Sequence, residues 1–134
     1  MQLSKGMEQK EGKPIRIYVN REGLLITSKL WNTKHNHGDV LSAAEQTLSD
    51  LGLNFLDLYL MHWPVLFEDG DINFPKDGDG NIIYADHDPC DTWKAMESLV
   101  DHGLVKAVGG MSSFNQAQLI EHCRNRDIVG VFEY

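Results

Sequence analysis

The feature that most restricts the fold is an alternation of short apolar runs with longer segments of helical periodicity. Buried strands are predicted at Leu24–Thr27 and Phe55–Met61, with a helix between them. Two more strands are predicted at Leu104–Val108 and Ile128–Phe132, and a helix at Asn115–Arg126 lies between them. A repeated order of strand, helix and strand is typical of an α/β fold with parallel strands and right-handed crossovers.

Capping residues mark the ends of the first two predicted helices. Asn36 begins the first, and Gly52 ends it where a left-handed residue is needed. Asp88 and Pro89 begin the second as N-cap and first helical residue, and Gly103 closes it. The residues predicted to face the core are Val40, Leu41, Ala44, Leu48 and Leu51 in the first helix and Trp93, Met96, Leu99 and Val100 in the second.

Composition limits the classes of partner. The 134 residues suffice for one domain, and a net charge of −8 argues against nucleic acid and against an anionic membrane surface. No apolar run approaches the length of a membrane span. Two cysteines, Cys90 and Cys123, make no disulfide framework, so we expect a cytoplasmic protein.

The amino-terminal residues differ in character from the rest. Residues 1–12 are rich in Gly, Lys and Glu and predict a frayed helix or a tail, and Pro14–Asn20 predicts an extended linker. We therefore expect a tail over residues 1–20 and one α/β domain over residues 21–134. Within that domain, His62–His87 is a long Gly- and Asp-rich segment, of the kind that is usually functional or disordered.

Polar and aromatic side chains gather after the predicted strands. In parallel α/β folds, ligands bind at the carboxyl ends of the strands, so these residues are expected to share one rim. An ammonium at Lys29 can stabilise a developing anion, and His62 can donate a hydrogen bond to an oxygen. Trp31 and Trp63 would supply an apolar wall. The rim residues are Thr27, Ser28, Lys29, Trp31, His62, Trp63, Pro64, Ser112, Ser113, Asn115 and Tyr134.

Other readings of the same residues are weaker. His35, His37 and His62 could form a metal site, although histidines two apart in an extended chain point to opposite sides. The Asp77–Asp88 segment has some calcium-loop spacings, but Ile82 stands where glycine is needed. A small flavodoxin-like regulatory domain also fits four strands and an acidic charge, and predicts a phosphate site that no motif supports.

Four segments resemble the aldo-keto reductases, closest to their NADP-dependent aldehyde reductase branch. They are Thr27-Ser28-Lys29-Leu30-Trp31-Asn32-Thr33-Lys34-His35, Leu56-Asp57-Leu58-Tyr59-Leu60-Met61-His62-Trp63-Pro64, Asp91-Thr92-Trp93-Lys94-Ala95-Met96-Glu97 and Gly103-Leu104-Val105-Lys106. The resemblance runs from about Arg21 to Asn115. It implies a TIM barrel that reduces aldehydes and ketones with NADPH.

The resemblance also implies roles for individual residues. Lys29 matches the lysine that lowers the pKa of the family's proton-donating tyrosine, and His62 matches the histidine that orients the carbonyl. Trp31 and Trp63 match pocket walls, so the implied substrate-binding residues are Trp31, His62 and Trp63. The implied cofactor-binding residues are Ser112, Ser113 and Tyr134, with Ser113 standing where the family has asparagine.

The resemblance implies an incomplete (β/α)8 barrel of about four parallel strands. The chain matches from the family's second helix and looks shortened after Asn115, so we expect a form truncated at both ends. The family's tyrosine and aspartate have no match, which predicts impaired activity. The alternative is a non-catalytic fragment or pseudoenzyme that associates through open sheet edges, since an incomplete barrel leaves such edges unpaired.

Overall fold

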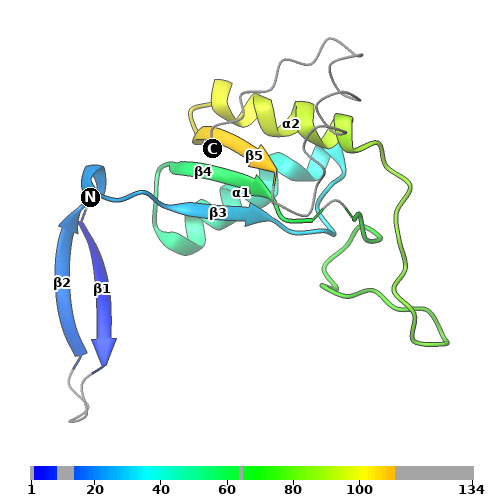
Figure 1. Ribbon diagram of the computed structural model, residues 1–134, viewed down its shortest axis with the longest axis horizontal. Coiled ribbons are helices and arrows are strands. Elements are labelled where there is room, and N and C mark those ends of the chain that lie inside the picture. The colour runs from blue at the N-terminus through cyan, green and yellow to red at the C-terminus, as the bar shows by residue number, and fades with distance from the viewer. Residues whose placement is uncertain (1, 9–13, 64, 111–134) are drawn as a thin grey trace.

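Three parallel strands form the central sheet of the computed structural model, which describes residues 2–8, 14–63 and 65–110. They are β3 (Thr27–Leu30), β4 (Leu56–Met61) and β5 (Val105–Gly110), in the spatial order β3-β4-β5 (Figure 1). Both strand pairs are parallel, which confirms the predicted α/β class. The predicted helix Asn115–Arg126 and strand Ile128–Phe132 lie outside the described residues.

Two helices connect the strands, and their ends follow the predicted caps. In α1 (His37–Leu51), the Asn36 side chain accepts a hydrogen bond from Gly38 N at 3.1 Å. This helix ends at Gly52, whose φ of 64° favours a residue without a Cβ. In α2 (Pro89–Asp101), Asp88 caps Cys90 N at 2.9 Å. Local side-chain chemistry therefore sets both helix starts.

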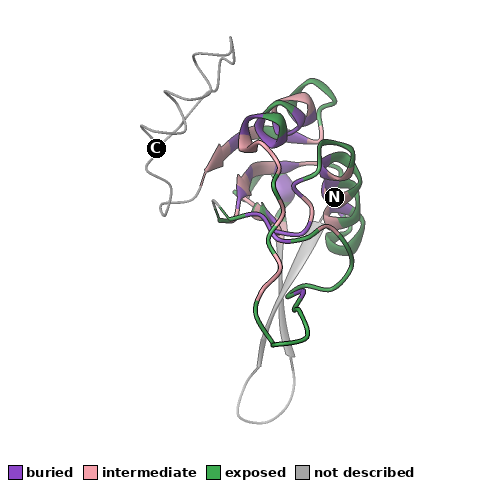
Figure 2. Cartoon of the chain, turned by 90° about the vertical axis from the view of Figure 1, so that its right-hand side faces the viewer, coloured by how far each residue is buried: buried purple, intermediate pink, exposed green. Residues whose placement is uncertain are grey.

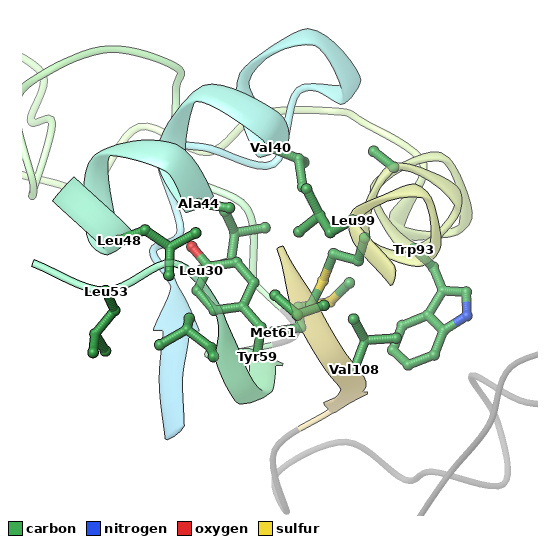
Figure 3. Close-up of a cluster of buried hydrophobic side chains, with 14 of the residues drawn as sticks. Leu30, Val40, Ala44, Leu48, Leu53, Tyr59, Met61, Trp93, Leu99 and Val108 are labelled. Atoms are coloured by element: carbon green, nitrogen blue, oxygen red, sulfur yellow. The ribbon is translucent and has the colours of Figure 1, made fainter. Parts of the chain in front are cut away.

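The core lies between the sheet and the two helices (Figure 3). Tyr59 and Met61 of β4 pack there with Trp93 of α2, and each is at most 1% exposed. Three residues predicted to face the core are instead partly exposed, because each lies at the margin of its helix's apolar face. They are Leu41, Leu51 and Val100, at 36%, 46% and 39% exposure.

The first strand begins later than predicted. Leu24–Thr27 was expected to be buried, but Leu25 is 78% exposed and pairing with β4 starts only at Thr27 opposite Leu58. Just before that point, Ile26 N donates to the Asp57 carboxylate at 2.9 Å, while Ile26 O accepts from Asp57 N at 3.0 Å and from Leu58 N at 3.3 Å. The shift places Lys29 inside β3, whereas the sequence placed it after the strand.

The amino-terminal segment forms two strands. β1 (Gln2–Glu8) pairs antiparallel with β2 (Pro14–Asn20), and a short 3₁₀ helix, η1 (Arg21–Gly23), leads toward the sheet. The expected frayed helix is therefore wrong for residues 2–8. An extended Pro14–Asn20 segment presents unpaired backbone groups, and a second strand satisfies them. The division of the chain at residue 20 stays a prediction.

The long segment after β4 is partly ordered by its own hydrogen bonds, although much of it is exposed (Figure 2). Isolated bridges join Phe67 to Tyr84 and Lys76 to Ile82. At the tip, Asp77 Oδ1 accepts from the backbone N–H groups of Asp79 and Asn81, both at 2.9 Å. In its described residues, the segment thus contains no helix or strand between β4 and α2, and isolated bridges and side-chain contacts hold it. None of the helices in the described part of the chain has the length and apolarity to cross a bilayer.

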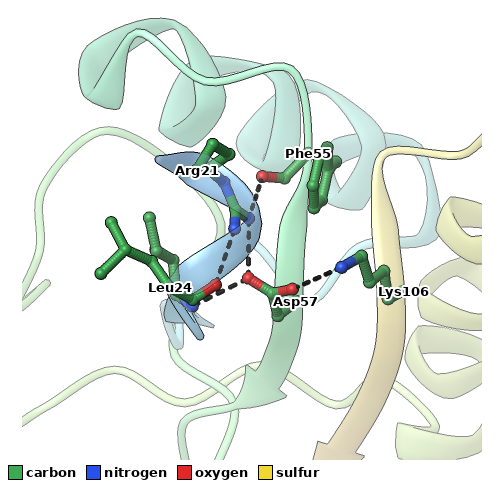
Figure 4. Close-up of polar contacts among 6 residues, drawn as sticks. Arg21, Leu24, Phe55, Asp57 and Lys106 are labelled. Carbon is green, nitrogen blue, oxygen red and sulfur yellow. Dashed lines mark hydrogen bonds and ion pairs between the residues drawn. The ribbon is translucent and has the colours of Figure 1, made fainter. Parts of the chain in front are cut away.

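A charged cluster ties the amino ends of the strands together (Figure 4). The Asp57 carboxylate contacts Arg21 at 2.7 Å and Lys106 at 2.8 Å. Arg21 also donates to Phe55 O at 3.0 Å and lies over the Phe55 ring. The cluster stands at the end of the sheet opposite to the predicted rim, so we interpret it as structural.

Candidate functional site

The strand register brings Lys29 and His62 to the same face of the sheet. Lys29 is the register partner of Leu60, and partners in a parallel pair project to the same side. His62 follows Leu60 by two residues and so projects to that side as well. Its backbone N–H donates to Leu30 O at 3.2 Å, which continues the pairing to the end of the strand. An ammonium and an imidazole therefore meet at the carboxyl ends of β3 and β4.

The protonation of His62 follows from this position. Partial burial lowers its pKa below the ordinary 6.5, and the nearby Lys29 ammonium lowers the pKa further. At neutral pH the ring is therefore predominantly neutral. A neutral imidazole keeps one N–H, so His62 can still donate a hydrogen bond to an oxygen.

Aromatic rings line the rim beside His62. The Trp31 ring centroid lies 5.2 Å from that of His62 and 5.8 Å from that of Trp63. Phe74 closes the far side at 5.3 Å from Trp31 in an edge-on arrangement. Such pairs add attraction beyond the area they bury. We call Trp31, Trp63, Phe67 and Phe74 the aromatic wall.

Two members of the aromatic wall were not found from the sequence. The Phe67 ring centroid lies 6.3 Å from that of Trp31, and Phe67 is buried. Phe74 is 50% exposed. Both come from the long segment after β4. A signal was available, because large aromatic side chains in a Gly- and Asp-rich segment need a surface to pack against. The sequence did not show that this surface would be Trp31.

The alternative metal site was considered at His35, His37 and His62. His35 is buried and His37 is exposed, so the two lie in different environments. Burial lowers the pKa of His35 to about 4, although Asp69 opposes this effect, and neither ring nitrogen has a hydrogen-bond partner within the described part of the chain. Among the residues that the structure describes, no three His, Cys, Asp or Glu side chains are grouped to hold a metal ion.

A separate cavity lies between the amino ends of α1 and α2. Its volume is about 320 Å³, and three histidines and three aspartates contribute to its lining. It does not include Lys29 or His62. The predicted cofactor contacts, Ser112, Ser113 and Tyr134, lie outside the described residues, as do Pro64 and Asn115, so the structure describes only the part of the predicted rim that comes from β3, β4 and the residues directly after them.

Comparisons with known proteins identify the family of the chain. The sequence model of the Aldo/keto reductase family matches residues 9–131. Aldo-keto reductase family 1 member A1 from Gallus gallus is 57% identical over 101 residues, and the protein of that name from Homo sapiens is 56% identical. Each match covers 75% of this chain and 31% of the relative, so the chain spans about a third of the length of these relatives.

Solved structures show the same relationship. The aldose reductase from Schistosoma japonicum has a TM-score of 0.77 at 46% identity, covering 84% of this chain and 36% of that one. The aldose reductase from Giardia lamblia has a TM-score of 0.66 at 45% identity, covering 69% and 31%. A parallel sheet with helices on one face is consistent with part of a (β/α)8 barrel. The chain therefore belongs to the aldo/keto reductase family of oxidoreductases.

Proposed function

We propose that this chain contributes to the NADPH-dependent reduction of aldehydes and ketones to alcohols, in the manner of an aldehyde reductase, in the cytoplasm. One observation carries the proposal: Lys29 and His62 share one face at the carboxyl ends of adjacent parallel strands. Family membership supports it, because the rim is where this fold binds ligands. The substrate class is a small molecule with a polar carbonyl and an apolar body.

Each residue has a distinct task in this proposal. The His62 N–H donates to the carbonyl oxygen and fixes its orientation, while Lys29 stabilises negative charge that develops on oxygen. Trp31 and Trp63 hold the apolar part of the substrate and exclude water. These contacts favour a substrate whose carbonyl is joined to an aromatic or long aliphatic group.

The nicotinamide end of NADPH would lie beside the substrate at the same rim. Ser112, Ser113 and Tyr134 would hold the ring and its amide, next to the cluster of Trp31, His62 and Trp63 that holds the substrate. When bound, NADPH supplies the hydride for the carbonyl carbon.

We expect slow turnover by the 134 residues taken alone. Within residues 19–110, Tyr59 is buried in the core and Tyr84 packs on Phe67 in the long segment. Neither belongs to the Lys29–His62 rim, so neither is assigned as the proton donor. Proton transfer from a positioned side chain contributes roughly 10²- to 10⁴-fold in rate. Binding is therefore a sharper test of the proposal than turnover.

The test measures binding of an aromatic aldehyde by quenching of tryptophan fluorescence, together with NADPH oxidation. His62→Gln and Lys29→Met should each weaken binding about tenfold, which equals about 1.4 kcal/mol. Lys34→Gln serves as the control, because Lys34 contacts only the exposed Asp71 among the ion pairs of the described residues. Equal affinity in all variants would contradict the proposed site. Fast turnover that Lys29→Met abolishes would refute the expectation of slow turnover.

A second candidate function is association through the sheet edges. Within the described residues, β3 and β5 each pair only with β4, so each presents one unpaired edge. Such edges are templates for another strand, including one from a second copy of this chain. Sedimentation velocity over a range of concentrations tests this. A monomer at all concentrations would refute the second candidate and leave the reductase proposal unaffected.

A further inference from the structure

The long segment after β4 is closed by a contact between its two ends. Asp69 Oδ2 lies 2.7 Å from His87 Nε2. Next to this contact, Glu68 N donates to Ile83 O and Ala85 N donates to Leu66 O, both at 3.0 Å. The segment from Leu66 to His87 is therefore a loop whose two ends are held together.

The same loop carries part of the aromatic wall. The Trp31 indole Nε1–H donates to Asn73 O at 3.0 Å, and the neighbouring Phe74 ring packs edge-on against Trp31. Trp31 itself is fixed by its place directly after β3. The position of Asn73 and Phe74 therefore sets how closely the loop approaches Trp31.

The Asp69 carboxylate has few hydrogen-bond donors, so its contact with His87 is important for the loop. Asp69 Oδ1 is buried and has no hydrogen-bond partner among the described residues, and Oδ2 also accepts a longer bond of 3.4 Å from Asn36. The Asp69 side chain is 29% exposed and the His87 side chain is 37% exposed. A carboxylate with one orphaned oxygen depends on its remaining donors, since leaving it unpaired costs more than an ordinary lost hydrogen bond.

The loop is also joined to the segment after β3 by the backbone bond from Phe67 N to Asn32 O at 2.9 Å and by one weaker ion pair. Lys34 contacts Asp71 at 3.0 Å, but Asp71 is fully exposed to water. Exposed pairs contribute little to stability. The contact between Asp69 and His87 is the better protected of these two side-chain contacts.

We propose that Asp69 and His87 form a positioning pair that clasps the loop and holds Asn73 and Phe74 against Trp31. Loss of the clasp lets the loop move away from Trp31 and widens the aromatic wall. The effect on substrate binding rests on the proposed function, whereas the effect on Trp31 does not. The pair touches neither Lys29 nor His62, so it acts through Trp31 and not on the reacting atoms.

The test is exchange of the Trp31 indole N–H with water, measured by NMR in ¹⁵N-labelled protein without cofactor or substrate. His87→Ala should accelerate this exchange about fivefold, which is the scale of one partly exposed hydrogen bond to a charged group. The Trp93 indole N–H, bonded to Glu97 at 2.9 Å, is the internal reference and should not change. His87→Gln keeps an N–H donor and should restore most of the protection.

Asp69→Asn is the second variant, because its side chain has nearly the shape of aspartate and tests the clasp even if His87→Ala unfolds. Lys34→Gln is the control and should leave Trp31 exchange unchanged. Equal Trp31 exchange in the wild type, His87→Ala and Asp69→Asn would overturn the proposal, as would faster exchange of Trp31 and Trp93 together. An intact clasp in a chain that binds no aldehyde would refute the proposed function alone.

Discussion

Replacement of Asp57 by asparagine should remove a large part of the stability at neutral pH. Burial by itself raises the pKa of Asp57, but hydrogen bonds from Lys106, Ile26 N and Arg21 outweigh it and lower the pKa from 3.8 to about 2. Since one pH unit corresponds to about 1.4 kcal/mol, this difference is worth up to about 2.5 kcal/mol. The Asp57 side chain is only 13% exposed, so water screens this contribution weakly.

The substitution also leaves a buried cation without its partner. The Arg21 side chain is 4% exposed, and its guanidinium would lose its carboxylate partner while keeping the carbonyl oxygens of Leu24 and Phe55 and the Phe55 ring. Breaking a buried pair from one side costs about 3–5 kcal/mol. The two estimates describe the same contacts and are not added, so we expect Asp57→Asn to lower the free energy of unfolding by about 3 kcal/mol.

Urea unfolding at several pH values tests this expectation. The folded-state pKa lies below the unfolded one, so the contribution is present above pH 4 and lost as the pH falls toward 2. The difference between the wild type and Asp57→Asn should therefore shrink in that range. Lys106→Met is the matched control: Lys106 is 60% exposed, and its loss should cost less than about 1 kcal/mol. A cost below about 1 kcal/mol for Asp57→Asn at pH 7 would refute the reasoning.

Three further substitutions probe the helices and the buried histidine. Met96→Ala should destabilise by about 2–5 kcal/mol in urea, because Met96 is fully buried, and a cost below about 1 kcal/mol would contradict the packing. Asp88→Ala should lower the thermal midpoint through a loss of about 1 kcal/mol, since Asp88 caps α2 at Cys90. The pKa of His35 is lowered to about 4, so its protonation should reduce stability as the pH falls from 6.5 to 4. His35→Leu should flatten that slope in urea midpoints, and an unchanged slope would exclude His35 as its source.

Local chemistry made the helices predictable. Asn36, Gly52 and Asp88 act on backbone groups within a few residues, so their roles could be inferred before any tertiary contact was known. The first strand was misplaced because its position depends on a distant residue. Residue pairing with β4 begins where Thr27 lies opposite Leu58, a register that the apolar run at Leu24 does not reveal.

The candidate site was predictable only in part for the same reason. Ligands bind at the carboxyl ends of parallel strands, and this rule was enough to group Lys29 with His62, because both residues lie close to the ends of the predicted strands. The partners of Trp31 depend instead on the path of the long loop after β4. Hydrogen bonds within that loop set its path and so bring Phe74 against Trp31. The spacing of residues in the sequence does not predict the path of the loop.

The proximity of Lys29 and His62 on one face of the sheet is tested most directly by an NMR titration of the His62 ring in the wild type and in Lys29→Met. The structure lowers the pKa of His62 through burial and through the Lys29 ammonium. The wild-type pKa should therefore lie below 6.5 and rise toward it when the ammonium is removed. An identical His62 pKa in both proteins would mean that the two groups do not lie close together on one face of the sheet.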